Sequence, residues 1–357
     1  MGSLTHELPL VIFTIAAQMS VGSFIVLGLV HVFNARVPAS TMDRIADPAL
    51  FAIGPLLLLG FIASTFHLGS PMRAINALGH VGTSWLSNEI LAGSVFLVLG
   101  AAFALTQWRK IGTPRLRQLV AVLAALCGVV LVLCISQVYS LRTVPAWDTW
   151  HTPVRFWSTT LMLGSLAVGA VLSLTALRSG HSHTKDAARA TSKERSLVGA
   201  TAGSGSTSAT AIEADRPDEA HLDDPRTDRE RADDDVAEAL LMRTIRGITI
   251  GAVAILGLGF VAMPVYLAQL GSHPDPAAAM SLSVFTEMHP GLAILYPLLI
   301  AAGVVVLAIL LSHLGRRRGD TSRRTVASMA VLAFFLVLAG EVLGRMFFYA
   351  SMFRTGL

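Results

Sequence analysis

Residues 119–138 read Leu119-Val-Ala-Val-Leu-Ala-Ala-Leu-Cys127-Gly-Val-Val-Leu-Val-Leu-Cys134-Ile-Ser-Gln-Val138, a continuous apolar stretch without a charged residue. A helix needs roughly 20 such residues to cross about 30 Å of hydrocarbon. A strand of a membrane barrel would instead alternate polar and apolar positions. The stretch therefore predicts a transmembrane helix, which satisfies its backbone hydrogen bonds internally in lipid.

Similar stretches make up about half of the chain. Of its 357 residues, 53% are hydrophobic and 14% charged, a composition outside the range of soluble domains. We predict an all-α, polytopic integral membrane protein with eight transmembrane helices, approximately Leu8–Val32, Ala49–Phe66, Ser87–Thr106, Leu119–Val138, Phe156–Leu177, Thr244–Leu270, Leu292–Leu314 and Val326–Phe348. No Lys or Arg precedes the first helix, so we expect it to be retained and not cleaved as a signal peptide.

The basic residues of the short loops predict the orientation. The loops after the first, third and seventh helices contain eleven Lys and Arg residues, against four on the opposite side. The positive-inside rule then places the first group in the cytoplasm and both termini outside, on the periplasmic side. The eleven are Arg36, Arg44, Arg109, Lys110, Arg115, Arg117, Arg316, Arg317, Arg318, Arg323 and Arg324, and the four are Arg73, Arg142, Arg155 and Arg354.

A long hydrophilic segment, residues 178–242, follows the fifth helix and has 9 basic and 14 acidic residues. It lacks the apolar surface needed to offset its ordering entropy, so we expect a disordered cytoplasmic loop. The domain organisation predicted is one membrane domain, residues 1–177 and 243–357, with this loop inserted. Asp233–Asp235 or the pair His181 and His183 could contact a metal or a partner, but a solvated linker is the simpler interpretation.

The cysteine and histidine patterns do not favour a redox centre on this chain. Cys127 and Cys134 lie about 10 Å apart along one predicted helix, too far for a disulfide. An iron–sulfur cluster needs four closely spaced thiolates, and a haem needs two facing axial ligands. We therefore predict no iron–sulfur cluster, haem, molybdenum or other metal here, although two histidine pairs could be proposed for haem, His67 with His289 and His31 with His313.

Ionisable residues gather at the helix ends that the orientation places outside. Such residues are costly inside a membrane and mark functional sites. They are His6, Glu7, His67, Glu89, Tyr139, Arg142, Glu287, His289, Glu341 and Arg345, with Trp147, Trp150 and Trp157 near the same surface. The inner half has only His31 and His313 near helix ends. The sequence therefore predicts chemistry that faces outward.

His67 and Glu89 are the candidates for proton transfer. His67 lies in Phe61-Ile-Ala-Ser-Thr-Phe-His67-Leu-Gly-Ser-Pro71-Met-Arg73, where an apolar helix reaches a membrane boundary. A quinol loses two protons with its two electrons, and a histidine with a carboxylate could accept and relay them. The alternative is an interfacial histidine that only ends a helix.

Two further groups of residues allow two interpretations each. Glu341 and Arg345 are four residues apart with the acid first, which favours an intrahelical ion pair. They could be a structural pair or part of the site. Trp147 and Trp150 are expected to be interfacial anchors and not walls of a quinone pocket.

Several unusual blocks occur in one order along the chain: Met1–Thr14, Gly60–Ala74, Leu86–Ile90, Val138–Tyr139, Thr143–Trp147 and Ala339–Tyr349. They resemble the membrane anchor subunit of dimethyl sulfoxide reductase, the DmsC family. The resemblance spans helices one to five and helix eight, and it is weak in helices six and seven. The loop after helix five looks like an insertion relative to a compact anchor.

The resemblance implies a function. Anchors of this family oxidise menaquinol near the outer face in anaerobic respiration. They pass the electrons to a subunit with four 4Fe-4S clusters, which feeds a molybdopterin catalytic subunit. His67 matches the family's quinol-associated histidine, and Glu89 matches the acid of its Ser-Asn-Glu block. We expect His67 to hydrogen-bond the quinol or accept its proton and Glu89 to relay the proton, while five residues shape the pocket or dock the partner: Arg73, Tyr139, Arg142, Glu341 and Arg345.

Other classes of protein stay open from the sequence. An anchor of the NrfD or polysulfide reductase type shares the eight-helix plan. A secondary transporter would have polar helix breaks near the midplane, and Pro55 and Pro264 lack accompanying charges. A passive anchor would only tether a soluble enzyme. In each case we expect a multi-pass protein of a prokaryotic inner (plasma) membrane, in contact with lipid and not with nucleic acid.

Overall fold

A computed structural model describes residues 8–33, 78–202, 225–315 and 323–355, together with positions 47, 54, 55, 58, 60, 62 and 76. Within these residues the regular structure is helical, without a strand. The helices are α2 (Leu8–Phe33), η2 (Leu78–His80), α5 (Trp85–Trp108), α6 (Pro114–Tyr139), α7 (His151–Ala202), α8 (Pro225–Gly271), α9 (Pro276–Ser283), the π-helical η3 (Val284–Met288), α10 (Pro290–Gly315) and α11 (Arg323–Ala350).

Seven of the described helices are long and apolar enough to cross a membrane: α2, α5, α6, α7, α8, α10 and α11. Large apolar side chains point outward from them, as at Val98, Leu126 and Val261, where at least 59% of each residue is exposed. This pattern suits lipid as the surrounding solvent. The all-helical, multi-pass class is confirmed. The expected span Ala49–Phe66 lies largely outside the described residues, so the total of eight stays a prediction.

The ends of the helices coincide with local capping signals more closely than with the ends of the apolar runs. Thr113 caps α6 by accepting a hydrogen bond from the Leu116 amide, and Pro114 follows at the first helical position. Asp275 and Pro276 begin α9 in the same way. The turn before α6 contains Gly112 at φ +77°, a conformation that favours glycine.

The segment expected to be a disordered loop from residue 178 is partly helical. Helix α7 continues past the membrane-spanning part to Ala202, and α8 begins at Pro225, well before its apolar part. The residues between these two helices lie outside the described part of the protein. The alanines, lysines and arginines near 185–195 are good helix formers, so an apolar run that ends does not by itself end a helix.

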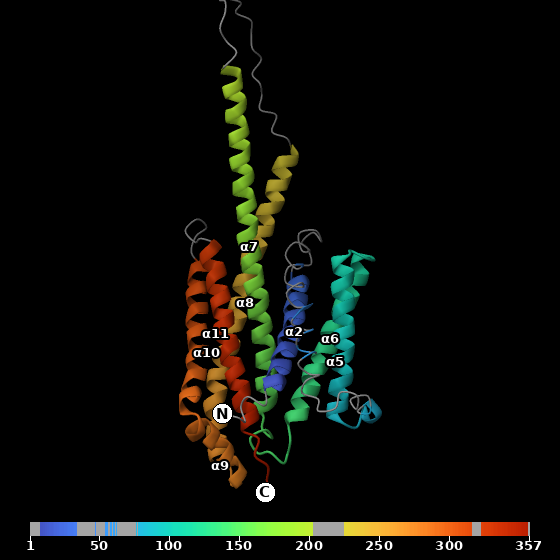
Figure 1. Cartoon of the computed structure of the whole chain (residues 1–357), viewed down its shortest axis with the longest axis vertical. Coiled ribbons are helices and arrows are strands. Elements are labelled where there is room, and N and C mark those ends of the chain that lie inside the picture. Colours follow the sequence, from blue (N-terminus) through green and yellow to red (C-terminus); the bar gives the residue numbers. More distant parts are fainter. Residues whose placement is uncertain are drawn as a thin grey trace, which may run out of the picture.

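Helices α2 and α7 form the centre of the bundle and bury most of their membrane-spanning residues. In Figure 1, α8, α10 and α11 lie on one side of this pair, and α5 and α6 lie on the other. Gly22 and Gly164 bring the α2 and α7 backbones together: a Cβ at Gly164 would lie 2.5 Å from the Gly22 Cα, and one at Gly22 would overlap the Thr160 carbonyl. Such close approach through small residues is typical of helix packing in lipid.

One end of the bundle gathers the start of α2, the α6–α7 connection and the end of α11. The Tyr349 hydroxyl donates a 3.2 Å hydrogen bond to Oγ1 of Thr14, joining α11 to the first turns of α2. The Thr355 amide donates a 2.8 Å bond to the Thr143 carbonyl in the α6–α7 connection. The first and last described residues of the protein therefore lie on the same side of the bundle.

Candidate functional site

A network of buried polar side chains connects α2, α7 and α11. Arg345 on α11 is completely buried and donates a 2.7 Å hydrogen bond from Nη2 to Oε1 of Gln18 on α2. Gln18 in turn donates from Nε2 to the Phe156 carbonyl on α7, at 2.8 Å. The guanidinium carbon of Arg345 lies 4.0 Å from the centre of the Phe156 ring, so a cation–π contact adds to the network.

Glu341, one turn earlier on α11, has a different partner from Arg345. Its Oε2 accepts a 2.7 Å hydrogen bond from the Thr159 hydroxyl of α7. The intrahelical ion pair that the spacing favoured is not present between these two described side chains. The prediction was wrong because each side chain turns toward another helix and forms a buried hydrogen bond there. A buried hydrogen bond to a charged group stabilises a protein more than a solvent-exposed ion pair does.

Arg155 belongs to this network, although the sequence interpretation placed it in a loop. The predicted helix began at Phe156, but α7 begins at His151, with Thr152 and Pro153 in its first turn. Proline in the first turn is a helix-start signal that could have shown this. The Arg155 side chain is 8% exposed, and its guanidinium lies 5.7 Å from the centre of the Tyr296 ring on α10.

Both arginines have hydrogen-bond donors that are not used by any described residue. Nε and Nη2 of Arg155, and Nε and Nη1 of Arg345, are buried without a hydrogen-bond partner among the described residues. Arg345 also lies within electrostatic range of both Arg155 and Glu341. This part of the interior thus holds two guanidinium groups and one carboxylate. A group that carries hydrogen-bond-accepting oxygens would be stabilised there, because unpaired buried donors are costly.

An aromatic cluster lies beside the network at the end of the bundle. The Tyr139 ring stacks on Phe156 with a centroid distance of 5.4 Å, and Trp147 stacks on Phe348 at 5.0 Å. Trp147 is 3% exposed and donates from Nε1 to the Phe348 carbonyl at 2.9 Å. It is therefore a buried packing residue, and its expected role as an interfacial anchor is wrong. Trp150 is exposed and donates to Gln269.

The remaining predicted site residues fall in different places. Glu89 is buried near the start of α5, within electrostatic range of Tyr139 and Tyr349. Arg142 is exposed in the α6–α7 connection. His67 and Arg73 lie outside the described residues. The structure thus brings Tyr139, Glu341 and Arg345 together at one end of the bundle, with Arg155 and Gln18 as unforeseen members.

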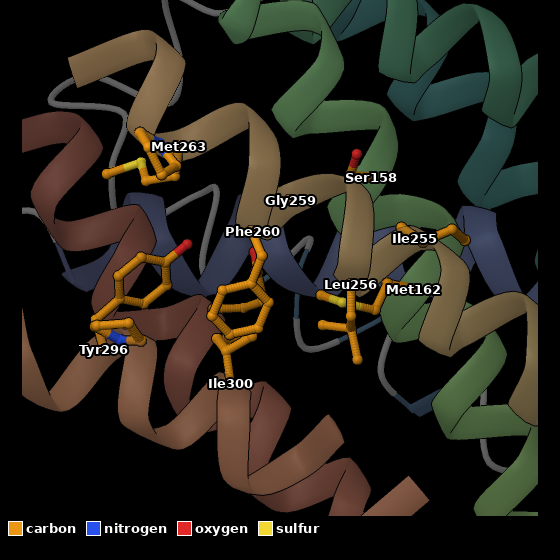
Figure 2. Close-up of a pocket in the computed structure, with 12 residues that line it drawn as sticks. Ser158, Met162, Ile255, Leu256, Gly259, Phe260, Met263, Tyr296 and Ile300 are labelled. Atoms are coloured by element: carbon orange, nitrogen blue, oxygen red, sulfur yellow. The ribbon is translucent and has the colours of Figure 1, made fainter. Parts of the chain in front are cut away.

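A pocket of about 160 Å³ opens beside this network between α7, α8, α10 and α11. Figure 2 shows Phe260 and Met263 of α8 near Tyr296 and Ile300 of α10, with Ser158 and Met162 on α7. Its wall is mainly apolar, and Glu341 supplies a carboxylate. Among the described residues, no group of three His, Cys, Asp or Glu side chains could hold a metal ion.

The fold and these side chains define a class: a multi-pass helical membrane protein with ionisable groups buried inside its spans. The sequence model of the family described as "DMSO reductase anchor subunit (DmsC)" matches residues 1–185, which is more than half of the sequence. The protein belongs to this family. The match includes the positions of His67, Arg73, Glu89, Tyr139, Arg142 and Arg155, whereas Glu341 and Arg345 lie beyond it.

Three curated relatives are similar over part of the sequence. The C component of the anaerobic dimethyl sulfoxide reductase of Escherichia coli is 42% identical over 175 residues, 49% of this protein and 60% of that one. The anaerobic dimethyl sulfoxide reductase component YnfH of the same organism is 38% identical over 172 residues, with 48% and 60% covered. The C component of the sulfite dehydrogenase of Allochromatium vinosum is 31% identical over 150 residues, with 39% and 45% covered. The protein thus matches about 60% or less of these relatives' length.

Proposed function

We propose that the protein is the quinol-oxidising membrane anchor of a dimethyl sulfoxide reductase-type complex. Membership of the DmsC family supports this role. The observation that carries it is the burial of Glu89 and the Arg345–Gln18 network within membrane-spanning helices. Ionisable groups buried within membrane spans are retained where they bind a ligand or move protons.

The chemistry proposed is the loss of two electrons and two protons from menaquinol. His67 hydrogen-bonds a quinol hydroxyl or accepts its proton, and Glu89 relays the proton toward the outer surface. Arg73, Tyr139, Arg142, Glu341 and Arg345 shape the pocket or dock the partner subunit. Tyr139, Glu341 and Arg345 have the burial that a pocket wall requires, and the exposed Arg142 is suited to docking.

The proposal includes the topology and the partners. The protein has eight spans in a prokaryotic inner membrane, both termini outside, and residues 178–242 in the cytoplasm between residues 1–177 and 243–357 of one membrane domain. An electron-transfer subunit with four 4Fe-4S clusters receives the electrons outside, and a molybdopterin subunit reduces the terminal acceptor. The start of α2, the α6–α7 connection and the end of α11 share one end of the bundle, which agrees with an even number of spans.

A substitution of Glu89 tests the proposal. Glu89→Gln keeps the size of the side chain but removes its ability to take up a proton, so menaquinol-analogue oxidation by membranes should fall about tenfold or more. The control is Glu287→Gln, which changes an exposed carboxylate of η3. Equal turnover of both variants, per assembled complex, would remove Glu89 from the mechanism.

A second candidate is electron flow in the opposite direction. One relative is named as part of a sulfite dehydrogenase, and a dehydrogenase would deliver electrons to the quinone pool. The same site would then protonate a quinone as it is reduced. Assays of quinol oxidation and of quinone reduction on the same membranes distinguish the two directions, and the main proposal requires the first.

A further inference from the structure

The pocket between α8 and α10 is separate from the Glu89 region. Helix α5, which carries Glu89, packs on α6, whereas the pocket lies across the bundle among α7, α8, α10 and α11. Phe260 lines the pocket and is 41% exposed, and the adjoining Val261 is 67% exposed. Exposed apolar residues of a membrane span face lipid, so a ligand reaches this pocket sideways from the hydrocarbon. The ligand must therefore be lipophilic.

Polar groups lie in the wall of the pocket and beside it. Glu341 lines it with a carboxylate that Thr159 orients by hydrogen bonding. Arg155 lies next to Tyr296, another lining residue, and has two buried nitrogens, Nε and Nη2, without a hydrogen-bond partner among the described residues. A small number of oriented polar groups in an apolar pocket is typical of a ligand site. The ligand therefore carries oxygens that accept hydrogen bonds.

Two prolines add acceptors for a ligand that can also donate. Pro264 in α8 and Pro297 in α10 have no N–H, so the carbonyls of Phe260 and Ala293 lose their usual helical donors. Phe260 and both prolines line the pocket. A phenolic hydroxyl both donates and accepts, so it matches a site that offers a carboxylate and a freed carbonyl and that has a guanidinium beside its lining residue Tyr296.

The size of the pocket limits what fits. Its volume of about 160 Å³ is below the roughly 300–1,000 Å³ of sites that enclose whole drug-sized ligands. A ring system fits, and a long hydrocarbon tail must remain outside. Because the pocket opens toward lipid, such a tail would extend into the bilayer.

We propose that this pocket is a second quinone site, which binds the ring of a quinone or quinol while its isoprenoid tail lies in the bilayer. This proposal rests on the proposed function, because it assumes that the protein binds quinol. Arg155 donates to a ring oxygen, and Glu341 accepts from a ring hydroxyl. The site lets a second quinone molecule associate with the half of the bundle that lacks Glu89.

Photoaffinity labelling of the complex in native membranes tests this site, with an azido-naphthoquinone as the probe. The label should appear on peptides containing residues 255–264 or 296–300, and excess menadione should displace it from the wild-type protein. Gly259 lines the pocket, and a Cβ added there meets nothing within 4 Å. Gly259→Leu should fill the pocket and reduce labelling about tenfold, since it removes ring burial worth more than about 1.4 kcal/mol.

The matched control is Gly257→Leu, on the same helix. A Cβ at Gly257 also meets nothing within 4 Å, but Gly257 does not line the pocket. It should label as the wild type does. Labelling that Gly259→Leu leaves unchanged, or that menadione fails to displace, overturns the second site. Loss of turnover in His67→Ala with labelling retained at α8 and α10 supports both proposals. Normal turnover in His67→Ala overturns only the function of His67.

Discussion

Nη2 of Arg345 and Oε1 of Gln18 are 2.7 Å apart, although 327 residues separate them in the sequence. The bond joins α11 to α2, the last described helix to the first. Arg345 has no exposed surface, and Gln18 has none either. A buried charge of this kind is held by its hydrogen-bond partners, so the pair couples the packing of the bundle to the polar interior that the function requires.

Gln18→Leu should lower the free energy of unfolding by about 2–3 kcal/mol, because it leaves a buried guanidinium with one partner fewer. The measurement is denaturant unfolding of the purified protein in mixed micelles. Gln137→Leu, which changes an exposed glutamine of α6, is the control and should stay within about 0.5 kcal/mol of the wild type. Equal stabilities of the two variants would show that the Gln18 bond contributes nothing measurable.

Gly164→Leu should destabilise the protein by about 3 kcal/mol or more, because α2 and α7 touch backbone to backbone at this position. The same unfolding measurement applies. Gly251→Leu is the matched control, since a Cβ there meets nothing within 4 Å. A Gly164→Leu protein as stable as its control would contradict the close approach of the two helices.

The spans were predictable because lipid imposes a simple rule: a continuous apolar run of sufficient length. The predicted bounds of α5 and α10 are within about two residues of the structure. Arg155 was missed because the predicted helix began one residue after it, and the Thr152–Pro153 signal was not used. The partners of Arg345 and Glu341 were not predictable, since periodicity along one helix does not say which helix packs against it. The role of His67 stays a prediction from the sequence.

Glu341→Gln should lower menaquinol-analogue oxidation about tenfold, because glutamine can still accept from Thr159 but offers the quinol hydroxyl a neutral amide oxygen, a weaker acceptor than a carboxylate. Thr159→Val keeps the carboxylate but removes the hydroxyl that orients it and that also bonds the Arg155 carbonyl at 2.9 Å, so its effect should be smaller. Rates are measured per assembled complex, with assembly determined by blotting. Full turnover in Glu341→Gln would exclude Glu341 from quinol oxidation and leave it with the second quinone site alone.

The proposed orientation predicts which introduced cysteines lie outside the cytoplasm. The test adds a membrane-impermeant maleimide to cells whose cytoplasmic membrane is intact and whose outer membrane or wall, if present, has been removed. Arg142→Cys lies in the exposed α6–α7 connection and should be labelled. Arg115→Cys, exposed at the start of α6, should react only after the membrane is opened. Of the two native cysteines, Cys134 is buried and Cys127 is partly buried, and both lie inside the α6 span, where an impermeant reagent has little access. The reverse pattern would place both termini in the cytoplasm.

The central claim is that this protein oxidises quinol through His67, and one rate tests it most directly. Menaquinol-analogue oxidation is measured in membranes that contain the assembled complex with His67→Ala, against His80→Ala, an exposed histidine of η2, as the control. The account predicts that His67→Ala loses about a hundredfold in rate, the contribution of a positioned proton acceptor, while His80→Ala keeps the wild-type rate. Wild-type turnover in a fully assembled His67→Ala complex would contradict the claim.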